Sequence, residues 1–287
     1  MIRTQLRICT ALWLLLSTTT AFVRTYRPTS RAVPAPLTMI FGGGGSTVIP
    51  KTTAERDRQA IAAVQAAVSK PKTPGYKLIE CEFPPLAALN KLGDGSLQSA
   101  QAVDAANLAF AVSVARSLSV PLIGPTATLL TSTAASSRLV QNAKKAYVSV
   151  HTLSKGLPDL VTKSSIFVLV APSSPRDYQT ADDLAQEGAT VVLVNGFAKT
   201  PKSVGGQATM AYYLKPLTYN SQIAGWLLRT WPRPWTTLAG NNKVLQTADD
   251  ADILVPATNT PDLRGSVKAV QQYVDQQAMA AREKAGR

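Results

Sequence analysis

The 287 residues include 30 Lys and Arg against 17 Asp and Glu, a formal net charge of +13, and 45% of them are hydrophobic. This composition fits one globular domain with a real core and excludes a disordered chain or a coiled coil. A single His and two Cys exclude a Cys/His zinc site, a disulfide framework and any metal site that needs two imidazoles. Residues 1–39 hold five Arg and no acid, so the rest carries 25 basic and 17 acidic residues, an excess of +8. That excess favours anionic lipid headgroups or acidic partners and does not specify a polynucleotide.

Residues 1–39 have the composition of a targeting sequence. Residues 1–21 combine two Arg with the apolar run 8–16 and a small-residue end, the layout of a signal peptide. The run is too short to span a membrane, because nine helical residues measure about 13 Å against a hydrocarbon core of ~30 Å. Residues 22–39 begin with Phe22, are rich in Arg, Thr, Ser and Pro, and contain no acid, which is typical of a transit peptide.

A signal peptide followed directly by a transit peptide that starts with Phe resembles the bipartite presequence of algae whose plastids came from a red alga. The resemblance implies a nuclear-encoded plastid protein, in the stroma or peripheral on the thylakoid. The alternative is a secreted protein with a basic pro-region. Cleavage after Ala21 argues against it, because removal of Cys9 leaves Cys81 with no disulfide partner. No later segment predicts a membrane span, since the most apolar stretch, residues 105–115, is far shorter than ~20 residues.

The glycine run within residues 40–51 predicts a flexible arm, because a P-loop would require a Gly-Lys-Ser/Thr sequence that this segment lacks. A single α/β domain is predicted for residues 52–287. Apolar steps of three and four predict helices at residues 52–69, 97–118, 126–145, 181–187 and from 261 onward. The expected N-caps are Thr52, Thr180 and Thr260. Alternating or continuous apolar runs predict strands at residues 77–83, 120–123, 147–152, 166–171, 190–194, 210–215, 225–230, 235–238 and 251–255.

Two fully apolar strands, 166–171 and 190–194, are joined by a short predicted helix, so we expect them to be parallel and central in a βαβ unit. The sequential short strands after Gly196 predict antiparallel additions. The expected fold is therefore α/β, with an open, mainly parallel sheet, a central βαβ unit, antiparallel strands at one edge and flanking helices. In the strand at 77–83, Cys81 faces the core, which indicates an inert structural thiol.

Several stretches resemble a plastid and cyanobacterial family classed as a domain of unknown function. They are residues 80–89 (ECEFPPLAAL), 105–111 (AANLAFA), 168–172 (VLVAP), 191–197 (VVLVNGF), 212–218 (YYLKPLT) and 225–235 (GWLLRTWPRPW). In plants, members of this family occur as factors needed for accumulation of photosystem II and as a domain attached to a chloroplast adenylate kinase. The resemblance runs through most of residues 76–260. It implies a stromal α/β protein tied to photosystem biogenesis, without an established reaction.

No catalytic motif stands out. A Ser-His-Asp triad would need His151, which lies in a strand pattern typical of a core or edge histidine. Asp182 and Asp183 lie in a first helical turn, where acids stabilise the helix dipole. Asp249, Asp250 and Asp252 lie in a predicted turn, and structural roles are favoured for both groups of carboxylates. The chain lacks a Walker lysine and a Gly-x-Gly-x-x-Gly motif. We therefore assign no catalytic residue, metal or cofactor, and an enzyme is disfavoured without being excluded.

Ligands of open α/β sheets bind beyond the C-terminal ends of parallel strands. Any small ligand of this chain is therefore expected at the turns after Ala171 and Val194. The candidate crevice residues are Ser173, Ser174, Asn195 and Lys199.

A second candidate surface combines indoles with guanidinium groups. We name it the Trp/Arg corner; its residues are Trp226, Arg229, Trp231, Arg233 and Trp235. Such residues anchor partner proteins or stack on bases. The leading interpretation is structural, with core indoles and arginines stacked on their neighbours. Partner binding comes second and nucleic acid third.

The sequence therefore predicts a plastid protein that acts as a non-enzymatic assembly or maintenance factor for photosystems. Its partners would be photosystem or thylakoid proteins, with peripheral contact to anionic lipid. One alternative is a nucleotide- or metabolite-binding protein or enzyme that uses the strand-end crevice. The other is a plastid RNA-binding protein, which would require a steep salt dependence of RNA affinity.

Overall fold

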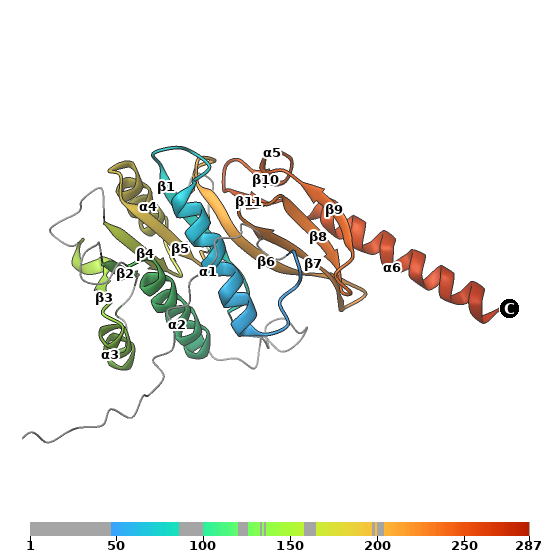
Figure 1. Ribbon diagram of the computed structural model, residues 1–287, viewed down its shortest axis with the longest axis horizontal. Helices are drawn as coiled ribbons and strands as arrows, with labels where there is room; N and C mark the ends of the chain where they lie inside the picture. Colours follow the sequence, from blue (N-terminus) through green and yellow to red (C-terminus); the bar gives the residue numbers. More distant parts are fainter. Residues whose placement is uncertain are drawn as a thin grey trace, which may run out of the picture. The chain divides into compact units, whose positions relative to one another are not determined.

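The computed structural model describes residues 47–85, 100–119, 126–132, 134, 136–157, 165–196, 199 and 204–286. The predicted presequence, most of the glycine arm and the strand predicted at 120–123 lie outside these residues. The described residues form a nine-stranded sheet in the order β3-β2-β4-β5-β1-β6-β7-β8-β9 (Figure 1). Its strands are β1 (Lys77–Glu82), β2 (Ala127–Thr131), β3 (Ser149–Thr152), β4 (Ile166–Val170), β5 (Thr190–Val194), β6 (Thr209–Tyr219), β7 (Gln222–Thr230), β8 (Trp235–Ala239) and β9 (Val244–Ala248).

The remaining elements surround this sheet. The helices are α1 (Thr53–Ser69), α2 (Ala100–Leu118), α3 (Ser137–Lys145), α4 (Pro175–Gln186), α5 (Asp250–Ile253) and α6 (Arg264–Ala285), with a 3-10 turn at Leu153–Lys155. A separate antiparallel pair joins β10 (Leu254–Val255) to β11 (Thr260–Pro261). None of the helices in the described part of the chain is long and apolar enough to cross a membrane.

The predicted βαβ unit is confirmed. Every residue of β4 and β5 is buried, and the strands pair in parallel with Ile166 opposite Thr190, joined by α4. In the order of the sheet, the six strands β3, β2, β4, β5, β1 and β6 are parallel to one another. Beyond β6, the strands β7, β8 and β9 are added one after another, each antiparallel to the strand before it. The structure is therefore the expected mixed α/β fold, with a mainly parallel sheet, antiparallel additions at one edge and flanking helices.

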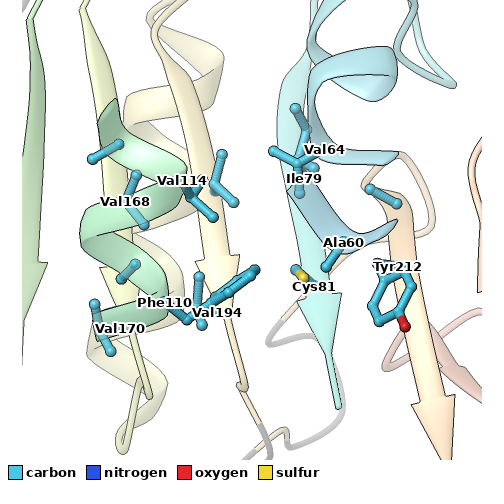
Figure 2. Packing of buried hydrophobic residues seen from close by; sticks show 14 of the residues in the cluster. Ala60, Val64, Ile79, Cys81, Phe110, Val114, Val168, Val170, Val194 and Tyr212 are labelled. Carbon is cyan, nitrogen blue, oxygen red and sulfur yellow. The ribbon is translucent and has the colours of Figure 1, made fainter. Parts of the chain in front are cut away.

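Helices cover both faces of the sheet. On one face, α1, α2 and part of α3 pack on a core that includes Ile79, Cys81 and Val168. Figure 2 shows side chains of α1 and α2, among them Val64 and Phe110, lying over the strands of this core. On the other face, α4 packs on Leu78 and its neighbours, and α6 packs on the β6 to β8 region.

Cys81 is fully buried, as its position in the alternation predicts. Burial raises the pKa of its thiol well above the usual value, with the nearby Glu82 carboxylate adding to the shift. A thiol held in its protonated form is a poor nucleophile and metal ligand. Cys81 is therefore a core residue.

The helix predicted at residues 126–145 is wrong in its first half. Residues Ala127–Thr131 form β2, which lies between β3 and β4 and hydrogen-bonds to both. Of the described residues in this range, the helical ones are Ser137–Lys145. The apolar residues of this segment fit both the helical period of about 3.6 residues and the strand period of 2 residues. The segment forms a strand because it pairs with a strand on each side. Thr128 and Thr131 are β-branched, which also favours a strand over a helix.

The helix predicted at 181–187 begins six residues earlier. Ser174 is its N-cap, Pro175 is its first residue and Asp177 completes a capping box. Thr180, the predicted cap, lies inside the helix and donates a hydrogen bond to the Arg176 carbonyl. A Ser-Pro-x-Asp sequence is a strong start signal, so the sequence did contain the correct boundary.

The C-terminal part differs in three places. The strand predicted at 251–255 is mostly α5, and only Leu254–Val255 is extended. Thr260 and Pro261 pair with those two residues as β11 and do not cap the last helix, which begins at Arg264. The edge strand β9 was not predicted, because its residues are largely exposed and lack an apolar run.

Candidate functional site

The connections that follow two neighbouring parallel strands, β2 and β4, lead to opposite sides of this pair. From β2 the chain runs through α3 to β3, whereas from β4 it runs through α4 to β5, on the other side of the pair. Helices α3 and α4 contribute to cores on opposite faces of the sheet. The chain therefore leaves a crevice beyond the ends of β2 and β4, which is where open α/β sheets bind ligands.

A cavity of about 910 Å³ lies at this point, and we name it the β2/β4 cavity. Its described lining residues come from α2, α3 and the ends of β2 and β4: Gln101, Asp104, Ala105, Asn107, Leu108, Ala109, Val112, Thr131, Ser132, Ala134, Ser136, Asn142, Val170, Ala171 and Ser173. The lining mixes short apolar side chains with amides and hydroxyls. Ligand pockets of proteins commonly have this character and size.

Asp177 ties the two strand ends together beside the cavity. Its buried carboxylate accepts hydrogen bonds from the Ser173 and Ser174 backbone N–H groups (2.9 and 3.0 Å) and from the Ser132 hydroxyl (2.8 Å). Burial raises the pKa of Asp177, but the bonds from Ser173, Ser132 and Ser174 outweigh it, so the net pKa is lowered. The N–H groups of the two residues immediately before α4 are thereby occupied by a carboxylate of the chain itself.

The structure brings only part of the predicted crevice set together. Ser173 lines the β2/β4 cavity, while Ser174 is the N-cap of α4. Asn195 is buried, and its Oδ1 accepts from the Phe83 N–H (2.8 Å) while its Nδ2 donates to the Asn107 Oδ1 (2.7 Å). Asn195 therefore links the ends of β5 and β1 to α2. A ligand-binding role for these residues remains a prediction.

Lys199 lies elsewhere, in a buried ionic cluster on the side of β1 that carries Leu78. Its Nζ is 2.5 Å from the Glu80 Oε1 and 2.6 Å from the Glu82 Oε1, and Asn259 donates a hydrogen bond to Glu80. Burial raises the pKa of Glu82 to about 7, against the opposing effect of Lys199. For Lys199 burial lowers the pKa, but the two carboxylates outweigh it and raise it overall. This cluster fixes the segment before β6 and the β10–β11 turn to the central strand.

The Trp/Arg corner is built around a buried guanidinium. Arg229 lies 5.0 Å from the ring centroid of Trp231 and 5.7 Å from that of Trp235, and its Nη2 is 3.1 Å from an Asp250 carboxylate oxygen. Burial lowers the pKa of Arg229, with Asp250 opposing the shift. Arg229 also donates to the Arg233 carbonyl, and the Trp235 indole N–H donates to Asp250 (2.8 Å).

These contacts agree with the structural interpretation of Arg229 and Trp235. Trp226, Trp231 and Arg233 stay partly exposed. The Trp231 indole N–H donates to the Lys70 carbonyl at the end of α1 (2.8 Å), which fixes its ring. A partner-binding role of the corner remains a prediction.

The other candidates take no part in a reactive cluster. His151 is exposed on β3, the strand at the edge of the sheet. Asp182 accepts a hydrogen bond from the Tyr76 hydroxyl, and Asp183 accepts from Gln179. Within the described ranges, no group of three or more His, Cys, Asp or Glu side chains is placed to hold a metal ion.

Two features of the site region were missed from the sequence. Thr131 and Ser132 were assigned to a helix, so the carboxyl end of β2 was not recognised as part of a crevice. Glu80 and Glu82 were placed on one side of their strand, but nothing local to the strand indicates that Lys199, more than a hundred residues away, lies between them.

Residues 50–250 match the family described as a domain of unknown function, DUF1995. The match spans more than half of the chain, and the protein belongs to this family. The predicted membership in a domain-of-unknown-function family is thereby confirmed. No curated protein and no solved structure shows a significant match to the chain.

Proposed function

We propose that this protein is a plastid factor that assists the assembly or maintenance of photosystems by binding a partner protein. The observation that carries the proposal is the set of stretches between residues 80 and 235 whose order and spacing resemble a family with photosystem II accumulation factors among its plant members. Membership in DUF1995 is consistent with that resemblance. The predicted presequence in residues 1–39 supports a plastid location.

The Trp/Arg corner is the surface we assign to the partner. Trp231 is anchored through Lys70 and stacks on Arg229, so its position is fixed before binding. Arg233, two residues after Trp231, and Lys70, whose carbonyl accepts from the indole N–H, are both positively charged residues. Fixed aromatic and arginine side chains are the residue types that dominate binding energy at protein interfaces. An acidic partner surface fits this arrangement.

Depletion of the protein in its host tests the proposed function. Pulse labelling of thylakoid proteins should show normal synthesis of photosystem core subunits and faster loss or slower assembly of their complexes. Complementation with the wild-type chain should restore assembly. Normal assembly in the depleted strain would contradict the proposal.

Binding of a small molecule in the β2/β4 cavity is the second candidate function. It is favoured by one observation: the cavity lies at the point where the connections of adjacent parallel strands diverge. Saturation-transfer NMR of the full chain with candidate ligands measures such binding directly. A bound molecule would act as a cofactor or signal for the assembly role, so the two candidates are compatible.

A further inference from the structure

We propose that the β2/β4 cavity binds an uncharged, hydroxyl-bearing small molecule and rejects phosphorylated ones. The inference rests on the second candidate function above and specifies its ligand class. It excludes nucleotides, although the cavity lies where nucleotide-binding α/β proteins hold their ligands.

The first reason is the occupation of the helix start. In dinucleotide-binding folds the phosphate accepts hydrogen bonds from the free N–H groups at a helix N-terminus. Here the Asp177 carboxylate already accepts from the Ser173 and Ser174 N–H groups. Its pKa is lowered by those bonds and by the one from Ser132, so it is ionised at neutral pH. A phosphate beside the start of α4 would find the Ser173 and Ser174 N–H groups already bound, and the negative charge of Asp177 would repel it.

The second reason is the charge of the lining. The described lining residues include one charged side chain, Asp104, and no Lys, Arg or His. A phosphorylated ligand would therefore find no counterion in this part of the wall. Asp104 and the nearby Asp177 carboxylate would both repel a phosphate, so discrimination of at least about tenfold against the phosphorylated ligand is expected.

The third reason is the kind of polar group that the cavity offers. Asn107 lines the cavity and is almost fully buried, and its amide Oδ1 is held by the hydrogen bond from Asn195. Gln101, Asn142 and Ser136 supply further amide and hydroxyl groups that both donate and accept. Ligand hydroxyls, which also do both, match this set. Leu108 and Val112 provide an apolar wall for the carbon frame.

Two matched pairs of probes test the ligand class: glucose with glucose 6-phosphate, and adenosine with AMP. Saturation-transfer NMR and calorimetry on the full chain should detect at least one uncharged probe. Its phosphorylated counterpart should bind at least about tenfold more weakly. Tighter binding of a phosphorylated probe at this site would overturn the ligand class but leave ligand binding in place.

Two variants locate the binding. Val112→Trp fills the cavity from α2 and should abolish probe binding, whereas Ser113→Trp, on the exposed side of the same helix, should leave it unchanged. Circular dichroism and thermal unfolding show whether both variants fold. Absence of binding by all four probes, or unchanged binding by folded Val112→Trp, would overturn both the ligand class and the second candidate function.

Discussion

Asn195 shows how one side chain connects three elements of the fold. Its backbone is left-handed (φ 53°), its N–H donates to the Cys81 carbonyl, and its amide pairs with the Phe83 N–H and with Asn107. The sequence placed Asn195 correctly after a central parallel strand. Its role as a hydrogen-bonded junction depends on Phe83 and Asn107, which are distant in the chain.

Asn195→Ala should lower the free energy of unfolding by about 3–7 kcal/mol. The change leaves a buried N–H and a buried carbonyl oxygen without partners, at about 1–3 kcal/mol each, and adds left-handed strain of about 1 kcal/mol. Asn220→Ala is the matched control, since Asn220 has φ 49° but an exposed side chain. Urea unfolding should show a loss of only about 1 kcal/mol for the control. Equal losses in the two variants would contradict the role assigned to the buried hydrogen bonds.

Glu82 should make stability fall as pH rises from about 4.5 to about 7. Burial raises the pKa of Glu82 from 4.5 to about 7 in the folded protein, so the folded state holds a proton that the unfolded state has released. Stability falls with pH wherever the folded state binds more protons. Glu82→Gln removes this contribution, and Glu283→Gln, exposed on α6, serves as the control.

The measurement is urea unfolding of wild type and both variants at several values of pH between 4.5 and 8. The difference between wild type and Glu82→Gln should change by about 2–3 kcal/mol over this range, to the disadvantage of wild type at high pH. The difference between wild type and Glu283→Gln should stay constant. Parallel curves for all three proteins would show that Glu82 ionises normally in the folded state.

At the scale of elements, α4 begins after the N-cap Ser174 and not after Thr180, the N-cap predicted from the sequence. Ser174→Ala should cost about 1 kcal/mol, because the Ser174 hydroxyl accepts from the Asp177 N–H and no other side chain replaces it. Thr180→Ala should change stability by less than about 0.5 kcal/mol, since Thr180 lies inside the helix and alanine favours helices. Thermal unfolding of the two variants gives the comparison. A larger cost at Thr180 would place the helix start where the sequence pattern first indicated.

Elements with a strong local pattern were predictable, and those defined by their neighbours were not. β4 and β5 are continuous apolar runs that can be satisfied only inside a sheet, so their position follows from the sequence. β2 carries Thr and Leu residues compatible with either period, and its strand state comes from pairing on both sides. β9 forms because β8 presents an open edge, which its own exposed residues do not signal.

The candidate site follows the same division. The rule that ligands bind beyond parallel strand ends pointed to the edge of the sheet at which the β2/β4 cavity lies, and Ser173 lines that cavity. The sequence predicted the turns after β4 and β5, whereas the structure places the cavity between β2 and β4. The shift follows from strand order, since β2 lies beside β4 and their connections diverge. Strand order depends on contacts across the whole chain.

At the scale of the whole molecule, the two candidate binding places lie in separate parts of the fold. The β2/β4 cavity lies at the carboxyl ends of parallel strands, and the Trp/Arg corner lies at the turn between the antiparallel strands β7 and β8. In this account the corner holds the partner and the cavity holds a small molecule. Variants at one place should therefore leave binding at the other intact.

Affinity purification from solubilised thylakoids tests the central proposal most directly. The tagged full chain and the exposed control Lys268→Ala should both recover photosystem subunits, identified by mass spectrometry. Arg233→Glu should lower recovery at least about fivefold. The substitution keeps the Arg233 carbonyl that Arg229 binds, so the corner itself should stay folded. Recovery of no photosystem subunit by the wild-type chain, or equal recovery by Arg233→Glu, would contradict the account.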